Sequence, residues 1–185
     1  ITCDGDTSTN DMVSIFSTNK VKNPQIKKFS DKRIRNFSRS VHDVLLNLAK
    51  QVVSDGEGAS KLISVNCINC KTEKDAKNIS FKIANSLLVK TAIAGEDPNW
   101  GRVAMAIGNS NSKINEQKLS ISFGPNKIYF KGSLFKNYDE RKVADYMKGK
   151  FIEIEVDIGQ GNKNFKAYTM DLTKKYIEIN ADYRT

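Results

Sequence analysis

Residues 89–102 read VKTAIAGEDPNWGR and combine an apolar run, a glycine turn, a helix start and the only tryptophan of the chain. Asp97 precedes Pro98, and an aspartate N-cap followed by proline at the first helical position is a typical helix start. The spacing of the apolar residues that follow predicts a helix over residues 99–108. The apolar run at residues 87–93 predicts a buried strand just before it. The stretch therefore predicts a well-specified connection in an α/β protein, with residues that are mainly structural.

Outward from this stretch, apolar periodicity predicts alternating helices and strands. Strands are expected at residues 1–6, 61–70, 119–123, 128–131, 151–158 and 164–170. Helices are expected from residue 7 to about residue 16, and at residues 30–53, 73–85, 139–147 and 172–179. The helix at 30–53 carries one continuous apolar stripe, formed by Ile34, Phe37, Val41, Val44, Leu45, Leu48 and Val52. Residues 61–93 follow a βαβ-like order, and the later strands are expected to be antiparallel, so the predicted class is mixed α/β (α+β).

The composition limits the class of protein. With 185 residues, of which 39% are hydrophobic, the chain can bury a real core. No apolar run reaches the ~20 residues of a membrane helix, and the first residues lack the pattern of a signal peptide. Three cysteines are an odd number, which argues against a secreted disulfide framework and for reduced thiols. A cytoplasmic protein without membrane contact is the expectation.

The net charge of +9 raises nucleic acid as a rival partner, because clustered Lys and Arg displace counterions from phosphates. The basic residues are scattered, and no basic segment carries the interleaved aromatic residues of an RNA-binding surface. The densest patch contains Lys27, Lys28, Lys32, Arg33 and Arg35. No nucleic-acid partner is predicted, and a solvated surface or a contact with an acidic partner explains the charge.

Two motifs that often carry chemistry are assigned structural roles. Cys67 and Cys70 form a CxxC, but they lie within a predicted strand, where residues three apart point to opposite faces, and no second ligand pair completes a zinc site. His42 is the only histidine and lies beside the apolar stripe of the long helix, without a Ser or Cys motif to serve. Neither metal binding nor a Ser-His-Asp hydrolase is expected.

Three acidic or terminal places remain. Asp4 and Asp6 flank a glycine, but their spacing does not match a calcium loop, so turn chemistry explains them. Glu57 lies between two glycines, which let the backbone approach a ligand and would allow the carboxylate to hold an ammonium group. A solvated loop glutamate is the alternative. The C-terminal residues 180–185 would ordinarily be regarded as a frayed end.

Four segments together resemble one enzyme family. They are ITCDGDTSTND at residues 1–11, DGEGASK at 55–61, VKTAIAGEDPNWGR at 89–102 and YIEINADYRT at 176–185. In this order they are similar to the ornithine acetyltransferases of arginine biosynthesis, also called glutamate N-acetyltransferases. The similarity spans the whole chain, and four extended motifs in register are more specific than any one of them.

The resemblance implies a precursor that cuts itself before an internal threonine, giving an α chain and a β chain whose first residue is the acyl nucleophile. This chain resembles most of the β chain. The nucleophile is then expected upstream of Ile1 and the oxyanion hole in the α chain, so no catalytic residue is assigned here. Thr2, Thr7 and Thr9 do not match the nucleophile's motif.

The resemblance assigns three substrate-binding residues by position: Glu57 in DGEGASK, and Asn180 and Thr185 in NADYRT. Their chemistry suits an amino acid such as ornithine, because a carboxylate pairs with an ammonium group while amide and hydroxyl groups donate to a carboxylate. The role of Arg102 stays open.

The implied reaction transfers acetyl from N-acetylornithine to a threonine and then to glutamate. No metal or organic cofactor is expected, although some members of the family accept acetyl-CoA as donor. An amide hydrolase of the same threonine-nucleophile superfamily and a non-catalytic partner subunit are the alternatives. The need for glutamate distinguishes the transferase from the hydrolase, since a hydrolase releases acetate without glutamate.

The resemblance also implies an αββα fold with a smaller C-terminal α/β domain. Residues 1–60 would belong to the catalytic domain shared with the α chain, residues 61–170 to the C-terminal α/β domain, and residues 171–185 to a tail that returns to the active site. The expected assembly is an α2β2 heterotetramer or larger.

Overall fold

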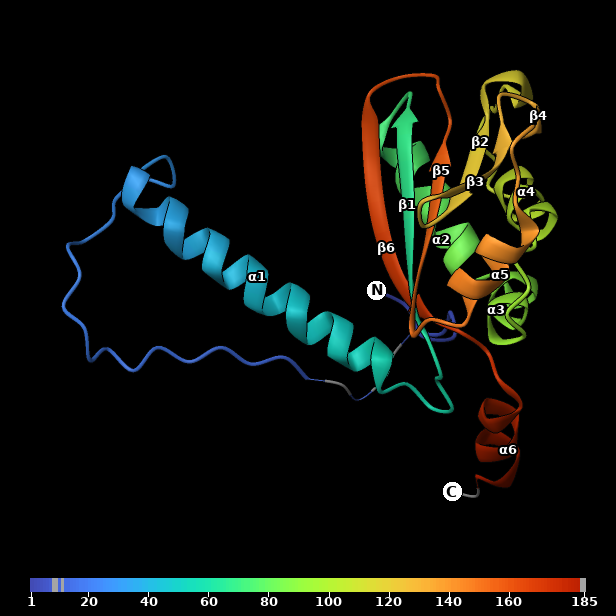
Figure 1. The fold of residues 1–185 in the computed structure, drawn as a ribbon. Helices are drawn as coiled ribbons and strands as arrows, with labels where there is room; N and C mark the ends of the chain where they lie inside the picture. The colour runs from blue at the N-terminus through green and yellow to red at the C-terminus, as the bar shows by residue number, and fades with distance from the viewer. Residues whose placement is uncertain (8–9, 11, 184–185) are drawn as a thin grey trace.

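The computed structural model describes residues 1–7, 10 and 12–183. Its strands are β1 (Leu62–Cys70), β2 (Ser120–Phe123), β3 (Asn126–Phe130), β4 (Ser133–Leu134), β5 (Phe151–Asp157) and β6 (Lys163–Met170). Its helices are α1 (Lys32–Ser54), α2 (Glu73–Ala84), α3 (Leu87–Ala94), α4 (Trp100–Gly108), α5 (Glu140–Met147) and α6 (Lys174–Asp182), with a 3-10 turn at Glu116–Lys118. The mixed α/β class predicted from the sequence is confirmed (Figure 1).

The six strands form one mixed sheet in the order β4-β3-β2-β5-β1-β6. Strand β1 is parallel to β5 and antiparallel to the edge strand β6, and every other pair is antiparallel. In the β1–β5 register, Ile63, Val65 and Cys67 lie opposite Ile152, Ile154 and Val156, and all six are buried. Because side chains alternate along a strand, this register directs one apolar row into the core and leaves a polar row, with Asn66 beside Glu155, on the other face.

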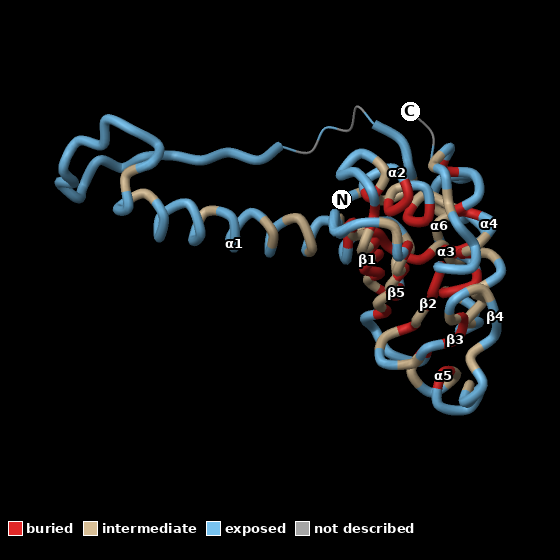
Figure 2. The backbone as a smooth tube through the Cα atoms, turned by 90° about the horizontal axis from the view of Figure 1, so that it is seen from above, coloured by how far each residue is buried: buried red, intermediate tan, exposed pale blue. Residues whose placement is uncertain are grey.

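Helix α2 packs on β1 and β6, and α4 packs on α2 and α3. Buried residues therefore gather in the sheet and in the helices beside it, as Figure 2 shows, whereas the described residues of the segment before α1, and all of α1 except Val53 near its end, are exposed or only partly buried. None of the described helices is long and apolar enough to cross a membrane.

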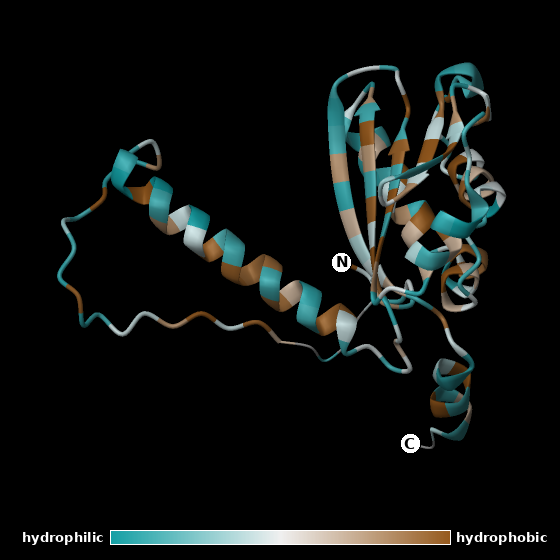
Figure 3. Ribbon diagram, in the orientation of Figure 1, coloured by the Kyte–Doolittle hydropathy of each residue, from teal (hydrophilic) through white to brown (hydrophobic). Residues whose placement is uncertain are grey.

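Helix α1 projects from this body (Figure 1). Its last turns contact β6 and β1, where Val53 is fully buried and the Lys50 ammonium lies 4.9 Å from the ring centre of Tyr168. The expected apolar stripe is present, as Figure 3 shows, but Phe37 and Val44 on it are mostly exposed. Residues 13–15 line a groove along this stripe, but they leave its outer part largely uncovered.

The predicted strand at residues 87–93 is wrong, because these residues form helix α3. Ser86 caps this helix by accepting a hydrogen bond from the Val89 amide at 3.4 Å. Residues 87–93 read LLVKTAI, and periodicity alone does not distinguish a strand from a buried helix in so short and largely apolar a segment. The predicted βαβ unit is therefore wrong too, and the parallel partner of β1 is the distant strand β5.

Two predictions for the N-terminal segment are also wrong. Residues 1–6 form bends and no strand, and residues 12–16 are extended and not helical; residues 8, 9 and 11, within the same predicted helix, lie outside the described residues. The apolar side chains that suggested the helix, among them Met12 and Phe16, are exposed. Without a surface to pack against, a short amphipathic segment gains little from becoming helical.

Smaller corrections concern helix ends and strand neighbours. Helix α4 begins one residue later than expected, and its N-cap is Asn99, which accepts from the Arg102 amide at 3.0 Å, and not Asp97. Strands β5 and β6 follow each other in sequence but are not neighbours in the sheet, since β1 lies between them. The long helix, the strand at β1, the helix at α2, and the hairpin of β2 and β3 are confirmed.

Candidate functional site

The loop after α1 carries Glu57 and is shaped by its glycines. Gly58 has a φ of +67°, which favours glycine, and a Cβ placed there would lie 2.5 Å from the amide nitrogen of Tyr176. The missing side chain lets the first turn of α6 pack directly against the loop. At Gly58 the close neighbour is the C-terminal helix, whereas at Gly56 it is the side chain of Met170; the predicted approach of a ligand to these glycines stays a prediction.

Asp171 joins the same loop to the end of β6. Its carboxylate is fully buried and accepts hydrogen bonds from the Ser60 amide at 2.7 Å, the Lys61 amide at 2.9 Å and the Ser60 hydroxyl. Thr173, at the start of α6, donates to the Gly58 carbonyl at 2.7 Å. These bonds fix where α6 leaves the body of the chain.

The result is that Glu57 and Asn180 meet. The Asn180 amide donates to the Glu57 carboxylate at 2.8 Å and also to the Tyr176 carbonyl at 3.0 Å. Both Glu57 and Asn180 are exposed, so both are accessible to a small molecule. Two of the three predicted substrate-binding residues, 123 positions apart in sequence, are therefore in contact. The third, Thr185, lies outside the described residues.

The first residues of the chain run beside this pair. The Thr2 amide donates to the Tyr168 carbonyl at 3.0 Å, and the Thr2 hydroxyl donates to Asn85 at 2.7 Å. Lys90, only 1% exposed, donates its ammonium group to the Cys3 carbonyl. Burial lowers the pKa of Lys90, an effect that nearby Asp4 opposes.

Asp4 connects this segment to α6. One carboxylate oxygen accepts from the Asp6 amide at 3.0 Å, which closes a turn around Gly5, whose φ is +99°. The other oxygen accepts from the Tyr176 hydroxyl at 3.0 Å. Burial raises the pKa of Tyr176, and the bond to Asp4 raises it further.

A cavity of about 540 Å³ opens between these segments. Carboxylates dominate its polar lining, and the substrate-binding candidate Glu57 is part of its wall. The lining comprises Ile1, Thr2, Cys3, Asp4, Asp6, Val52, Asp55, Gly56, Glu57, Met170 and Tyr176. The volume suits a small amino-acid derivative, and the acidic wall favours a cationic group on it.

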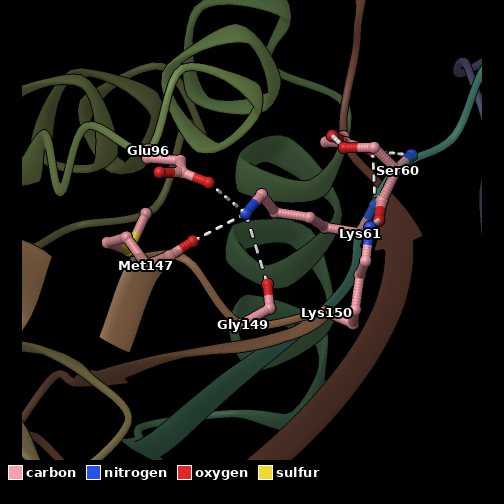
Figure 4. A network of polar contacts seen from close by, with 7 residues as sticks. Ser60, Lys61, Glu96, Met147, Gly149 and Lys150 are labelled. Atoms are coloured by element: carbon pink, nitrogen blue, oxygen red, sulfur yellow. Dashed lines mark hydrogen bonds and ion pairs between the residues drawn. The ribbon is translucent and has the colours of Figure 1, made fainter. Parts of the chain in front are cut away.

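Glu96, in the segment just before Trp100, contacts the end of the loop that carries Glu57. Figure 4 shows Lys61, 6% exposed, donating to Glu96 at 3.1 Å, to the Met147 carbonyl at 2.7 Å and to the Gly149 carbonyl at 3.3 Å. Lys61 thus ties the end of the Glu57 loop to the turn after α3. Trp100 stacks on Tyr129 with ring centres 4.8 Å apart.

Arg102 also has a structural place. Its guanidinium donates to the Leu88 carbonyl at 2.8 Å and to the Thr91 hydroxyl at 3.4 Å, which joins α4 to α3. Arg102 is not among the residues that line the cavity. Its contacts explain its presence without a role in binding.

The two cysteines of the CxxC lie on one side of β1, contrary to the sequence prediction that they face opposite ways. Asn69 has a φ of +57° and the register of β1 with β6 shifts between Cys67 and Cys70. This irregularity turns both thiols into the core, with sulfur atoms 3.2 Å apart. Burial raises the pKa of both thiols, which suits inert core residues.

Among the described residues, no group of three or more potential ligands could hold a metal ion. His42 is exposed on α1, away from the cavity, as a surface residue of that helix.

Sequence reasoning nominated Glu57 and Asn180, assigned Asp4 to a turn, which the bond from the Asp6 amide confirms, and missed the bond from Tyr176 to Asp4 as well as Lys90, Asp171 and Tyr176 themselves. Only Tyr176 had a usable signal, because it lies four residues before Asn180 and so shares a face with it once the segment is helical. Lys90 lies in the segment that the sequence predicts to be a strand, where nothing marks it as a site residue. Asp171 follows a predicted strand and belongs to no motif.

Fold and site together define a mixed α/β chain that presents a carboxylate and an amide, drawn from distant segments, at the edge of a small acidic cavity. The chain matches the ArgJ family over residues 1–185. It is 49% identical to the Arginine biosynthesis bifunctional protein ArgJ of Zymomonas mobilis and 45% identical to that of Gluconobacter oxydans, each over the whole of this chain. It belongs to the ArgJ family.

A solved structure supports this assignment. The crystal structure of the Arginine biosynthesis bifunctional protein argJ from Bacillus halodurans matches with a TM-score of 0.92 and 37% identity, covering 98% of this chain and 85% of that chain. The curated relatives are longer, since the chain covers 45% of the Zymomonas protein and 44% of the Gluconobacter protein. The chain thus spans less than half the length of these relatives.

Proposed function

We propose that this chain is part of a glutamate N-acetyltransferase, in which it binds N-acetylornithine and glutamate for acetyl transfer in arginine biosynthesis. The observation that carries the proposal is the bond between Asn180 and Glu57 at the rim of the acidic cavity. Both residues were assigned to substrate from separate motifs, and a shared site requires them to be neighbours. Membership of the ArgJ family, whose relatives are named for arginine biosynthesis, agrees with it.

The chemistry follows from the two substrates. N-acetylornithine carries a side-chain ammonium and a carboxylate. The Glu57 carboxylate can pair with the ammonium, and Thr185 can donate to the carboxylate, as can Asn180 once the substrate carboxylate replaces Glu57 as the acceptor of its amide. A threonine upstream of Ile1 attacks the acetyl carbonyl, its proton passes to the departing nitrogen, and ornithine leaves. The amine of glutamate then attacks the ester, frees the threonine and gives N-acetylglutamate. An oxyanion hole from the companion chain would stabilise both intermediates.

The companion is proposed to be the α chain of the same precursor, in an α2β2 or larger cytoplasmic assembly. The solved Bacillus chain agrees with a divided precursor, because this chain covers 85% of it but less than half of the curated relatives. No cofactor is proposed. Acetyl-CoA enters only as an alternative acetyl donor.

A mass spectrum tests the proposal. The whole protein, containing this chain and its companion, is exposed briefly to N-acetylornithine and measured under denaturing conditions. An acetyl adduct on a threonine upstream of Ile1, removed by glutamate with formation of N-acetylglutamate, supports the transferase. Acetate release that needs no glutamate would identify an amide hydrolase, and absence of both would leave a non-catalytic subunit.

Two variants test the residues. Glu57→Gln should raise the KM for N-acetylornithine by tenfold or more, since a charge-assisted bond is lost, and deletion of residues 180–185 should reduce turnover severely. The matched control Glu140→Gln changes an exposed glutamate in the first turn of α5 and should leave both constants unchanged. Full activity in the truncated protein would contradict the assignment of Asn180 and Thr185.

A further inference from the structure

Helix α6 is held to the rest of the chain mainly by polar contacts at its N-terminal half. No residue of α6 is buried, and Ile177 is largely exposed. Most helices in proteins are stabilised by burying an apolar face, so a helix without one depends on its remaining contacts for its position. The placement of Asn180 beside Glu57 therefore rests on a few hydrogen bonds.

Two of these hydrogen bonds are made by side chains on the same face of α6. Tyr176 and Asn180 are four residues apart, one above the other on the helix. The Tyr176 hydroxyl donates to Asp4 at 3.0 Å, while the Asn180 amide donates to Glu57 at 2.8 Å. One face of α6 thus joins two carboxylates that come from different segments and line the same cavity.

Asp4 can hold α6 in place because both of its carboxylate oxygens accept hydrogen bonds. One closes the turn onto the Asp6 amide and the other receives the Tyr176 hydroxyl. Thr2 and Cys3, just before it, are bound to Asn85 and to Lys90 on the body of the chain. The segment that receives the Tyr176 hydroxyl is therefore itself anchored.

We propose that Tyr176 is a positioning residue, whose hydroxyl ties α6 to Asp4 and so sets the distance between Asn180 and Glu57 across the substrate site. The proposal rests on the proposed function, because it concerns how that site is assembled. It adds a residue that touches no reacting atom and acts through Asp4. Tyr176→Phe removes only this hydroxyl and keeps the aromatic ring and the backbone that lies against Gly58.

The test uses the whole protein with its companion chain. Tyr176→Phe should raise the KM for N-acetylornithine about tenfold, the size expected for one lost hydrogen bond to a carboxylate, with kcat within about threefold of the parent. Self-cleavage and the acetyl adduct at saturating substrate should persist. The matched control Tyr138→Phe removes a hydroxyl from a tyrosine that packs against the core outside this network, and should change neither constant.

A double-mutant cycle distinguishes action through Asp4 from a general loss of structure. In an Asp4→Ala background, Tyr176→Phe should raise KM by less than twofold, because the bond is already absent. An unchanged KM in the single variant, or a full tenfold effect in the Asp4→Ala background, would overturn the proposal.

Hydrogen exchange reports on the same bond without catalysis. The amides of α6 should exchange faster in Tyr176→Phe than in the parent, while those of β1 should not change. If the parent protein forms no acetyl adduct, the proposed function fails, yet this measurement still decides the role of Tyr176. Equal exchange in α6 of both proteins would then overturn the positioning role.

Discussion

At the scale of the residue, the site depends on residues that shape the loop carrying Glu57 without lying in the site themselves. Gly58 allows α6 to approach, and Asp171 completes the hydrogen bonding of the loop that Gly58 belongs to. Neither is expected to touch substrate. Both act on the position of the loop that carries Glu57, the proposed binding residue.

Gly58→Ala is expected to lower the free energy of unfolding by about 1–3 kcal/mol, because alanine is strained at positive φ and its Cβ meets the Tyr176 backbone. It should also raise the KM for N-acetylornithine by displacing α6. Chemical denaturation and steady-state kinetics measure the two effects. Gly108→Ala is the control, since nothing lies within 4 Å of a Cβ there and a helical position gains from alanine. Equal stability of the two variants would contradict this account of Gly58.

Asp171→Asn is expected to destabilise the protein by about 2–3 kcal/mol. The buried carboxylate accepts three hydrogen bonds, and an amide presents donors where an acceptor is required. Urea denaturation measures the change. Asp145→Asn alters an exposed carboxylate whose ion pair with Lys148 is also exposed, and should have no measurable effect.

At the scale of the element, two differences between prediction and structure have the same cause. In both cases the prediction rests on the spacing of apolar residues within the segment, and the tertiary structure departs from that spacing. In α3, Val89, Ala92 and Ile93 are buried at helical spacing, but Leu87 and Leu88 extend the apolar run and conceal that spacing. In β1, the positive φ of Asn69 interrupts the two-residue alternation on which the prediction for the cysteines relied.

The buried CxxC leads to a prediction on thiol reactivity. Because burial raises the pKa of Cys67 and Cys70, both thiols stay protonated near pH 8 and should react slowly with iodoacetamide. Mass spectrometry should find at most one adduct on the native protein, at Cys3, and three after unfolding in guanidinium. Rapid labelling of all three thiols in the native protein would contradict the core position of the pair.

At the scale of the whole molecule, α1 and the segment before it stand apart from the body. They carry exposed apolar residues and much of the positive charge, with eight Lys and Arg residues against one Asp in residues 20–39. A large exposed apolar patch is typical of an interaction surface. A companion chain that is apolar and acidic in matching places would cover it.

The chain produced alone is therefore expected to self-associate, and the chain produced with its companion to purify as a complex. Val44→Glu places a charge on the exposed apolar stripe and should reduce recovery of the complex at least tenfold. Asn36→Glu, on the polar side of the helix, should not. Size-exclusion chromatography measures both, and a monomeric chain alone, or equal recovery of both variants, would contradict this expectation.

Sequence alone determined the mixed α/β class, the long amphipathic helix and most strands, because these depend on local periodicity and caps. It also nominated Glu57 and Asn180 as substrate-binding residues, through motifs that the resemblance placed in one family; the structure shows that the two are in contact. Only the tertiary structure decided the strand order, the helix at α3, the bulge that turns Cys67 and Cys70 to one side, and the contacts of Asp4, Lys90, Asp171 and Tyr176. These features depend on contacts between residues that are far apart in the chain. A local sequence pattern does not indicate which distant group will form a hydrogen bond with a buried charged group or a hydroxyl.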